Sequence, residues 1–220
     1  MNGLLIVGAG GHGRVVLDTA LAMNRWERIA FLDDYHKNSS IYGYPVIGRI
    51  NQAREFLNDY KDAVIAIGDN FMRVQLLKEF MEMGFNLPVI KHPQAFISKN
   101  AEVESGTMIF AQAAVNVGAK VGFGCIINTA SVVEHDCILG DGVHLSPGVR
   151  LGGEVRIGKY SWIGIGASVI HRIAIGEGVV IGGGAAVISD IEDYVTAVGV
   201  PARVVKKRGK SDKIMYSDVD

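Results

Sequence analysis

The sequence is poor in cysteine and proline, and neither sign of charge is in excess. Five prolines among 220 residues exclude a proline-rich linker or a collagen-like chain. Two cysteines, Cys125 and Cys137, make no disulfide framework and belong to no CxxC or Cys/His cluster that would bind zinc, so we expect no metal. The 22 basic and 23 acidic residues leave a formal net charge of -1, which argues against a nucleic acid partner.

Long uncharged segments are also missing. The longest of them covers positions 105–119 and includes Gln112 and Asn116, so it is too short and too polar to span a membrane. The start of the chain shows no basic region and no small-residue cleavage site, which a secretory signal would need. We therefore expect a soluble, reduced, cytoplasmic protein with no membrane insertion.

Glycine is the residue present in excess. Its 28 occurrences make about 13% of the chain, against about 7% in average proteins. Nine glycines precede residue 97, 17 lie within residues 97–192, and two follow. The second half of the chain therefore requires glycine repeatedly.

A six-residue repeat fills that second half. Every sixth position from Ile97 to Val187 holds Ile, Val or Leu, sixteen in a row, although these types fill only 30 of the 96 positions from 97 to 192. This period fits neither an amphipathic helix nor an ordinary strand, and it is typical of a hexapeptide β-helix. Three successive hexapeptides make one triangular coil, with the aliphatic side chains pointing to the axis.

Two other slots of the repeat have a structural interpretation. Cys125 and Cys137 occupy a slot of mostly small or β-branched residues two places before the aliphatic one, so we expect them to be buried and inert. The slot after the aliphatic residue is glycine in seven hexapeptides, where we expect tight corners to require a residue without Cβ. These glycines are residues 122, 140, 152, 158, 164, 176 and 182.

The first 92 residues follow a different pattern, an alternation of strands and helices around a glycine-rich turn. Residues 8–13 match G-x-G-x-x-G, and Asp33 and Asp34 follow about 20 residues later. This predicts a small parallel sheet with a phosphate-binding turn. A histidine within the motif, His12, and the short domain favour a nucleotide-like ligand over a nicotinamide cofactor. We expect strands over 4–7, 29–32, 63–67 and 87–90, and helices over 14–23, 51–58 and 70–83.

Together the two halves resemble the nucleotide-sugar acetyltransferases of the sialic acid O-acetyltransferase-like, hexapeptide-repeat family. The resemblance is greatest to the N-acetyltransferases of UDP-4-amino sugars in the bacillosamine pathway. It covers the chain to Arg203, through the segments 8–13, 31–34, 66–70, 128–136 and 199–202.

The resemblance implies an α/β N-terminal domain followed by a left-handed parallel β-helix. The corresponding domains are residues 1–92, which would bind the nucleotide sugar, 93–205, which would carry the acetyltransferase site, and a flexible C-terminal tail over 206–220. It also implies a homotrimer, with acetyl-CoA as co-substrate between neighbouring prisms.

The residues themselves indicate a candidate base. Transfer of an acetyl group to an amine requires a neutral amine, so a group with a pKa near 7 is expected beside the thioester. His135 lies in an outward slot between Glu134 and Asp136, and a neighbouring carboxylate can fix the tautomer and raise the basicity of an imidazole. One coil further on stands Gly153, which we expect to leave an open slot for the pantetheine arm.

Other site residues follow from the resemblance. It makes Asp136 the acidic partner of the base, where the sugar-acetylating relatives often have glutamate. It places acetyl-CoA at His144, Gly153, Ile165 and Gly183. It places the nucleotide sugar at Gly10, Gly11, His12, Asp33, Asp34 and Gly68.

The sequence leaves several functions open. The first is N-acetylation of the 4-amino group of a nucleotide-linked amino-deoxy sugar, with a UDP-sugar favoured and a GDP-sugar possible. An O-acetyltransferase acting on sialic acid or another sugar hydroxyl would use the same base. A non-catalytic, nucleotide-sugar-binding assembly protein and a nicotinamide oxidoreductase are the remaining alternatives.

Overall fold

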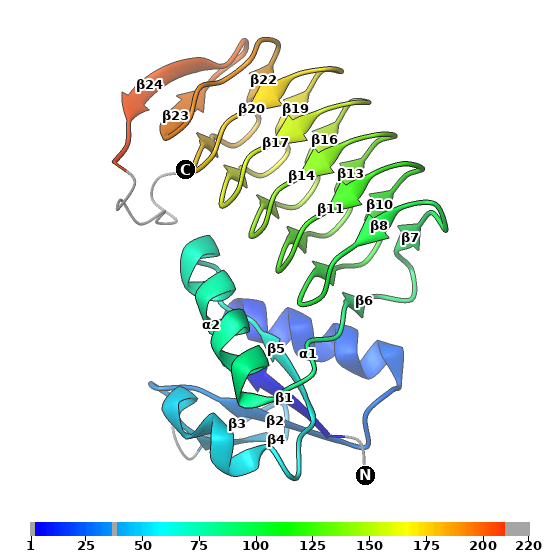
Figure 1. Cartoon of the computed structure of the whole chain (residues 1–220), viewed down its shortest axis with the longest axis vertical. Helices are drawn as coiled ribbons and strands as arrows, with labels where there is room; N and C mark the ends of the chain where they lie inside the picture. Colours follow the sequence, from blue (N-terminus) through cyan, green and yellow to red (C-terminus); the bar gives the residue numbers. More distant parts are fainter. Residues whose placement is uncertain (1–2, 37–38, 210–220) are drawn as a thin grey trace.

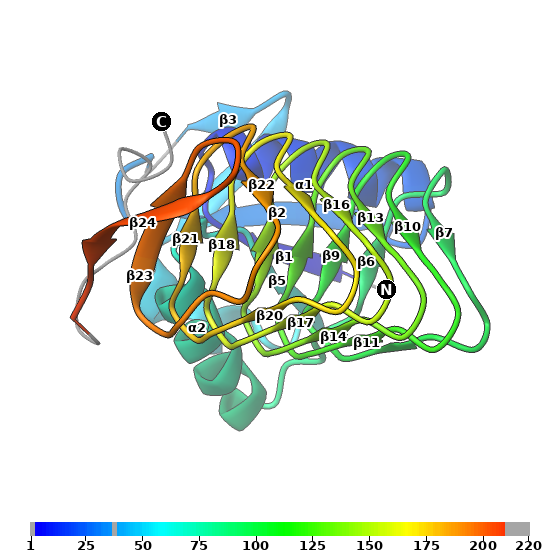
Figure 2. The ribbon, with the colours of Figure 1, turned by 90° about the horizontal axis from the view of Figure 1, so that it is seen from above.

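A computed structural model describes residues 3–36 and 39–209 of the chain. Figure 1 shows a small α/β part formed by the N-terminal residues, with a stack of coils formed by the rest. From above, the coils lie over one another and over the N-terminal part (Figure 2). No helix among the described residues combines the length and the apolar character that crossing a membrane requires.

The N-terminal part is a five-stranded sheet with the order β3-β4-β2-β1-β5. The central strand β1 pairs in parallel with both β2 and β5, and all five of its residues are buried. The strands are β1 (Gly3–Val7), β2 (Arg28–Leu32), β3 (Ser40–Ile41), β4 (Tyr44–Gly48) and β5 (Asp62–Ile65). The helices are α1 (Gly11–Met23), α2 (Asn70–Met83) and a 3-10 helix, η1 (Ile50–Phe56), which replaces the helix expected over 51–58.

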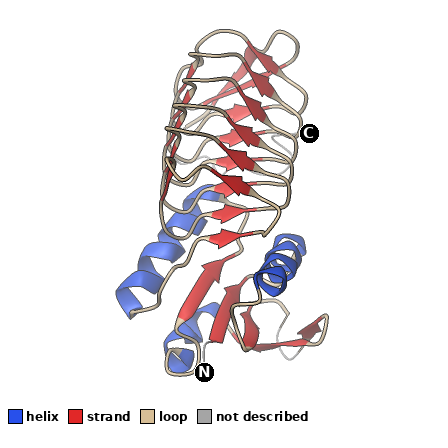
Figure 3. Ribbon diagram, turned by 90° about the vertical axis from the view of Figure 1, so that its right-hand side faces the viewer, coloured by secondary structure: helices blue, strands red, loops and turns tan. Residues whose placement is uncertain are grey.

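The coils form three sheets, which we call the eight-, six- and five-stranded faces, and all their strands run parallel except β24. Figure 3 shows the strands stacked as ladders. The eight-stranded face consists of β6 (Ile90–Lys91), β9 (Met108–Ile109), β12 (Ile126–Ile127), β15 (His144–Leu145), β18 (Trp162–Ile163), β21 (Val180–Ile181), β23 (Val195–Val198) and β24 (Arg203–Lys207). The six-stranded face consists of β7 (Phe96–Ile97), β10 (Ala114–Val115), β13 (Val132–Val133), β16 (Arg150–Leu151), β19 (Ser168–Val169) and β22 (Ala186–Val187). The five-stranded face consists of β8 (Glu102–Val103), β11 (Lys120–Val121), β14 (Ile138–Leu139), β17 (Arg156–Ile157) and β20 (Ala174–Ile175).

The register confirms that three hexapeptides make one coil. Val115 pairs with Val133, and Val133 pairs with Leu151, so equivalent residues of successive coils lie side by side. The aliphatic residues fill one continuous core, which also contains both cysteines. Burial raises the pKa of Cys125 to about 12 and that of Cys137 to about 11, so both thiols stay protonated and unreactive at neutral pH.

The strand expected over residues 87–90 of the N-terminal sheet is wrong. Ile90 instead begins β6 in the eight-stranded face, where it pairs with Met108 of the following coil. The 18-residue spacing of the coils thus continues back to Ile90. Before it, Asn86 joins the N-terminal sheet through an isolated bridge to Asp62 and a side-chain hydrogen bond to the same residue. At the other end, β24 pairs antiparallel with β23 and includes Lys206 and Lys207, the first residues of the expected tail. Residues 210–220 of that tail lie outside the described residues.

Glycine has two different tasks in the coils. The seven glycines after the aliphatic residues keep ordinary backbone angles, and a Cβ there would overlap the neighbouring coil, as at Gly152, where it would lie 2.6 Å from the His171 nitrogen. The left-handed conformation falls two residues later, at eight glycines and six other residues. Close approach of two coils, and not the turn itself, therefore explains the glycine slot that the repeat revealed.

Helix α2 packs against a row of glycines that recur at the same position of successive coils. Gly106, Gly124 and Gly142 lie at the corner between the five- and eight-stranded faces, and Leu77 and Val74 cover them. The buried Leu77 side chain approaches both Gly106 and Gly124, so it cannot move away from one without approaching the other. This row of glycines is thus the surface of the β-helix against which α2 of the N-terminal part packs.

Arg73, also on α2, fixes this contact with hydrogen bonds. Its side chain is fully buried. It donates to the carbonyl oxygens of Gly124 (2.8 Å) and Gly142 (2.9 Å) in the coils, and to those of Ile67 (3.0 Å) and Gly68 (3.2 Å) after β5. A planar guanidinium can satisfy acceptors on both sides at once, so this residue ties the two parts of the molecule together.

We predict that Gly124→Ala destabilises the protein more than Gly166→Ala. The two glycines have nearly the same left-handed φ, +65° and +66°, so an alanine costs the same backbone strain at each, about 1–2 kcal/mol. A Cβ at Gly124 would lie 2.5 Å from Leu77 Cδ1, whereas one at Gly166 meets nothing within 4 Å. Overpacking should add about 1–3 kcal/mol at Gly124 alone. Thermal unfolding of both variants measures the difference, and equal shifts would contradict the packing role of α2.

Candidate active site

His135 lies at the corner between β13 of the six-stranded face and β14 of the five-stranded face. Its Nδ1 atom is 2.9 Å from Asp136 Oδ2, so the shorter carboxylate does reach the imidazole. Asp136 adopts a left-handed conformation with φ of 58°, and its carboxylate lies over Gly118, where a Cβ would overlap it. The left-handed conformation of Asp136 and the absence of a side chain at Gly118 therefore both allow the carboxylate to lie against the His135 ring.

This geometry defines the chemistry of the imidazole. A carboxylate can only accept a hydrogen bond, so Nδ1 carries the hydrogen and Nε2 keeps a free lone pair. The hydrogen bond to Asp136 raises the pKa of His135, and the negative charges of Asp136, Glu154 and Glu134 add to the effect. The side chain is half exposed, so the imidazole can be reached from outside.

Gly153 lies one coil further along the same corner. A Cβ there would overlap the Nε2, Cε1 and Cδ2 atoms of His135, so the imidazole itself lies over this glycine. The open slot expected for a pantetheine arm is thus filled by the ring of the base. Gly153 makes room for His135.

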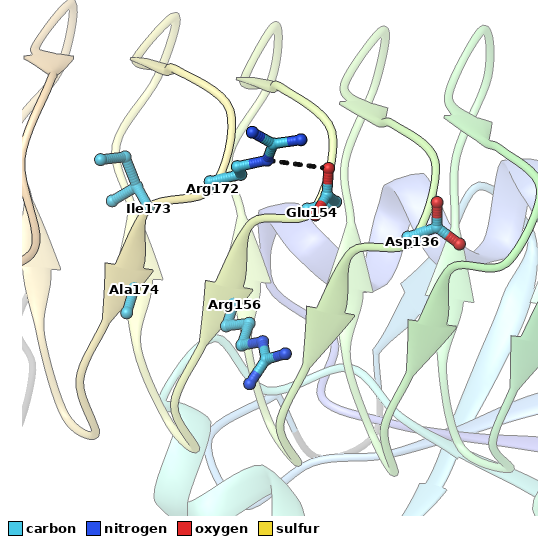
Figure 4. Close-up of a pocket in the computed structure, with 6 residues that line it drawn as sticks. All are labelled: Asp136, Glu154, Arg156, Arg172, Ile173 and Ala174. Carbon is cyan, nitrogen blue, oxygen red and sulfur yellow. Dashed lines mark hydrogen bonds and ion pairs between the residues drawn. The ribbon is translucent and has the colours of Figure 1, made fainter.

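A groove of about 460 Å³ continues along this corner (Figure 4). Asp136, Glu154 and Arg172 occupy the same position of three successive coils, and Arg172 Nε donates to Glu154 Oε1 at 3.0 Å. Arg156 closes the groove on the five-stranded face, with Ile173 and Ala174 at the far end. This charged row is an addition to the residues expected from the sequence, although the 18-residue spacing from Asp136 to Glu154 and Arg172 is visible there.

His144 lies elsewhere, on the eight-stranded face that the N-terminal part covers. It is 5% exposed and stacks on Trp162 with ring centroids 5.0 Å apart. Its Nε2 lies 3.3 Å from the Asn128 amide nitrogen, and Trp162 in turn donates to Ser146 Oγ at 2.7 Å. Among the described residues, nothing hydrogen-bonds to the buried Nδ1 of His144. The sequence did not indicate that Trp162 and Ser146 belong to this site, because it shows only their positions in the repeat.

His12 faces the same region from the first turn of α1. Its ring meets Phe110 of the β-helix edge-on at 5.5 Å, and its buried Nε2 has no hydrogen-bond partner within the described part of the chain. Burial lowers the pKa of His12 to about 3, with the charge of Arg73 adding to the effect. Burial also holds the pKa of His144 well below its usual value, again with contributions from Arg73 and His12. Both imidazoles are therefore neutral at physiological pH.

The glycine-rich turn between β1 and α1 divides into packed and open positions. Gly13 packs against the Gly8 carbonyl group, where a Cβ would not fit. At Gly10 and Gly11, in contrast, a Cβ would meet nothing within 4 Å, so the protein itself does not require glycine there. The N-terminus of α1 has no side-chain cap, and its free N–H groups point out of the same turn. Bare backbone and a helix N-terminus suit an approaching phosphate.

Asp33 fixes the shape of this turn. Its Oδ2 accepts a hydrogen bond from Ala9 N at 2.8 Å, and its Oδ1 accepts from Tyr35 N and His36 N and lies 2.9 Å from His36 Nδ1. Burial by itself would raise the pKa of Asp33, but these hydrogen bonds outweigh it and lower that pKa.

The other residues expected to bind the nucleotide sugar are held by hydrogen bonds within the N-terminal part. Asp34 Oδ1 accepts from Ile50 N at the start of η1, at 3.1 Å. The Gly68 carbonyl oxygen accepts from Arg73. Gly10, Gly11, His12, Asp33 and Gly68 follow or flank strands of the same parallel sheet, so they belong to one end of it.

The expected catalytic and acetyl-CoA residues thus fall into three separate places. His135, Asp136 and Gly153 share one corner of the prism, and His144 lies on the eight-stranded face with His12 above it. Ile165, which is 63% exposed, and Gly183 lie on the corner between the eight- and six-stranded faces. A single chain brings His135 together with Gly153, but not with the other expected acetyl-CoA residues, His144, Ile165 and Gly183. Across residues 3–36 and 39–209, no cluster of three or more His, Cys, Asp or Glu side chains could hold a metal ion.

Comparison with known proteins accounts for both parts of the chain. The model of the PglD N-terminal domain family matches residues 3–80, and that of the bacterial transferase hexapeptide repeats matches residues 118–153. The GDP-perosamine N-acetyltransferase of Escherichia coli O157:H7 is 28% identical over 218 residues, covering 94% of this chain and 98% of its own.

Two solved structures share the whole fold. The acetyltransferase domain of PglB from Neisseria gonorrhoeae, in complex with acetyl coenzyme A, is 40% identical with a TM-score of 0.90, over 93% of this chain and all of that one. PerB from Caulobacter crescentus, in complex with CoA and GDP-perosamine, is 34% identical with a TM-score of 0.89, over 94% and 98% of the two chains. These similarities confirm the family and the fold class that the sequence motifs indicated. The chain therefore belongs to the nucleotide-sugar N-acetyltransferases that join a PglD N-terminal domain to a hexapeptide-repeat β-helix, and it is an acetyltransferase.

Proposed function

We propose that this protein transfers the acetyl group of acetyl-CoA to the 4-amino group of a nucleotide-linked amino-deoxy sugar, with His135 as the general base. The observation that carries the proposal is the His135–Asp136 pair, in which a 2.9 Å hydrogen bond fixes Nδ1 and leaves Nε2 free. A UDP-4-amino sugar is the proposed substrate. A GDP-sugar is the second candidate, because a similar structure contains GDP-perosamine.

The reaction is a direct attack on the thioester. The sugar amine attacks the carbonyl carbon, His135 Nε2 takes the proton of the amine, and the Asp136 carboxylate stabilises the resulting imidazolium. The C–S bond then breaks, and the proton passes to the CoA thiolate. A covalent enzyme intermediate is not part of the scheme, because Cys125 and Cys137 are buried and their raised pKa values keep them protonated.

The nucleotide sugar binds at the N-terminal part in this proposal. The free N–H groups of α1 hold its diphosphate, with Gly10 and Gly11 allowing close approach. Asp33 maintains the turn through Ala9 and Asp34 holds the start of η1, so their part is to shape the site. The neutral His12 and His144, each with a bare or weakly bonded nitrogen, lie where the sugar would approach the β-helix.

Acetyl-CoA binds between subunits of a homotrimer. Within one chain, His135 lies at a different corner from Ile165 and Gly183, so a neighbouring prism is needed to bring these corners together. Exposed apolar side chains on and beside the six-stranded face support such packing, because they would be covered by a second copy. They are Val117, Ile165, Ile170 and Ile188.

Replacing the base tests the function. In His135→Ala we expect release of the CoA thiol with UDP- and GDP-linked 4-amino sugars to fall by about 10²–10⁴, the usual contribution of a general base. His171→Ala, on the same corner two coils away, should keep wild-type activity. If the rate of thiol release fell by less than about tenfold, His135 would not be the general base. Mild alkali distinguishes the product, because an amide survives it and the ester of a sugar hydroxyl does not.

The pH dependence of kcat/KM tests Asp136. His135 must be neutral to accept a proton, so activity is lost as the pH falls through its pKa, which the bond to Asp136 raises above the ordinary value. Asp136→Asn removes that charge while tolerating the left-handed conformation, so the acidic limb should move to lower pH and the plateau rate should fall. An acidic limb that stays in place would show that another group titrates.

Gly153→Ala tests the placement of the imidazole. A Cβ at this position overlaps only the outer atoms of His135, so the ring can swing away at little cost in stability. We expect normal thermal unfolding with kcat reduced about tenfold or more, because misplacing a catalytic group by about 1 Å costs up to about 100-fold. Wild-type kcat in this variant would show that the ring does not act from its position over Gly153.

A further inference from the structure

Tyr35 is the most exposed large hydrophobic residue in the part of the chain that the structure describes. Its side chain is 94% exposed and follows the end of β2 by three residues. No hydrogen bond or ring contact of its phenol group occurs within the described chain. An aromatic ring this exposed is available to stack on a ligand that approaches from outside.

The backbone that carries this ring is held on two sides. Asp33 Oδ1 accepts from Tyr35 N at 2.8 Å, while Oδ2 of the same carboxylate accepts from Ala9 N in the glycine-rich turn. Asp34, between them, binds the first residue of η1. The buried Asp33 carboxylate thus connects the backbone of Tyr35 to the glycine-rich turn, which is open at Gly10 and Gly11. The position of Tyr35 is therefore preorganised relative to the phosphate-binding turn.

The order of groups along a nucleotide fits this arrangement. In parallel sheets of this type, the phosphates lie at the N-terminus of the first helix and the nucleoside extends over the end of the next strand. That next strand is β2, and Tyr35 stands just beyond its carboxyl end. The flat face of a nucleobase beyond the ribose would therefore arrive at the phenol ring.

We propose that Tyr35 is the platform on which the nucleobase of the nucleotide sugar stacks. The inference rests on the proposed function, which supplies the nucleotide-linked substrate, and it adds a residue that contacts the base. Stacking requires only a π-face, so it serves uracil and guanine alike. Tyr35 therefore contributes affinity for the nucleotide, and the choice between bases falls to other groups.

Tyr42 provides a matched control. It is also a tyrosine of the N-terminal part and is 77% exposed, but it lies in the turn between β3 and β4. Because β4 runs parallel to β2, the start of β4 lies at the opposite end of the sheet from Tyr35. Tyr42→Ala should therefore remove an exposed phenol ring, as Tyr35→Ala does, without affecting nucleotide binding.

The experiment is calorimetric titration of Tyr35→Ala, Tyr35→Phe and Tyr42→Ala with UDP, GDP and inorganic pyrophosphate. We expect Tyr35→Ala to weaken UDP and GDP binding about tenfold or more, the loss typical of one stacked base, with pyrophosphate binding unchanged. Tyr35→Phe and Tyr42→Ala should bind UDP and GDP within about twofold of wild type, and Tyr42→Ala should also keep the wild-type kcat and the wild-type KM for acetyl-CoA.

Two results would overturn the inference. Unchanged UDP and GDP binding in Tyr35→Ala would show that the ring meets no base. An equal loss for the nucleotides and for pyrophosphate would show that the side chain only supports the shape of the turn. Failure of the proposed function has a different signature, because the wild-type protein itself would then fail to acetylate nucleotide-linked 4-amino sugars.

Discussion

Close contact between successive coils is the constraint on which the rest of the structure depends. Parallel strands pair at about 4.8 Å, so each coil leaves room for backbone and little else at its corners. Glycines such as Gly152 and Gly158 keep an ordinary backbone and lack a Cβ because the next coil occupies its place. The left-handed residues then turn the chain from one face to the next. Side chains at the same position of every coil are thereby brought into register.

The candidate base uses this register directly. Asp136 turns the chain at a corner, lies over Gly118 of the preceding coil, and binds His135, whose ring lies over Gly153 of the following coil. The same stacking produces the surface against which α2 packs, because Gly106, Gly124 and Gly142 recur at equivalent corners. One geometric rule thus places the imidazole at one corner and joins the N-terminal part to another.

Burial divides the histidines into two chemical classes. His135 is exposed beside a carboxylate, and the hydrogen bond to Asp136 raises its pKa above that of a free imidazole. His12 and His144 are enclosed between the two parts of the chain near Arg73, and they remain neutral. The residue type is the same in each case, and the difference comes from solvent access and the sign of the nearest charge.

The sequence by itself determined the repeat, the coil length, the glycine-rich turn and the register that sets His135 one coil from Gly153. Periodicity could supply these because each depends only on spacing along the chain. Only the tertiary structure decided that Ile90 belongs to the β-helix, that Arg73 joins the two parts, and that the ring of His135 itself fills the space over Gly153. It also separated His135 from Ile165 on different corners. These features depend on contacts between segments far apart in sequence and on side-chain direction, which no local pattern encodes.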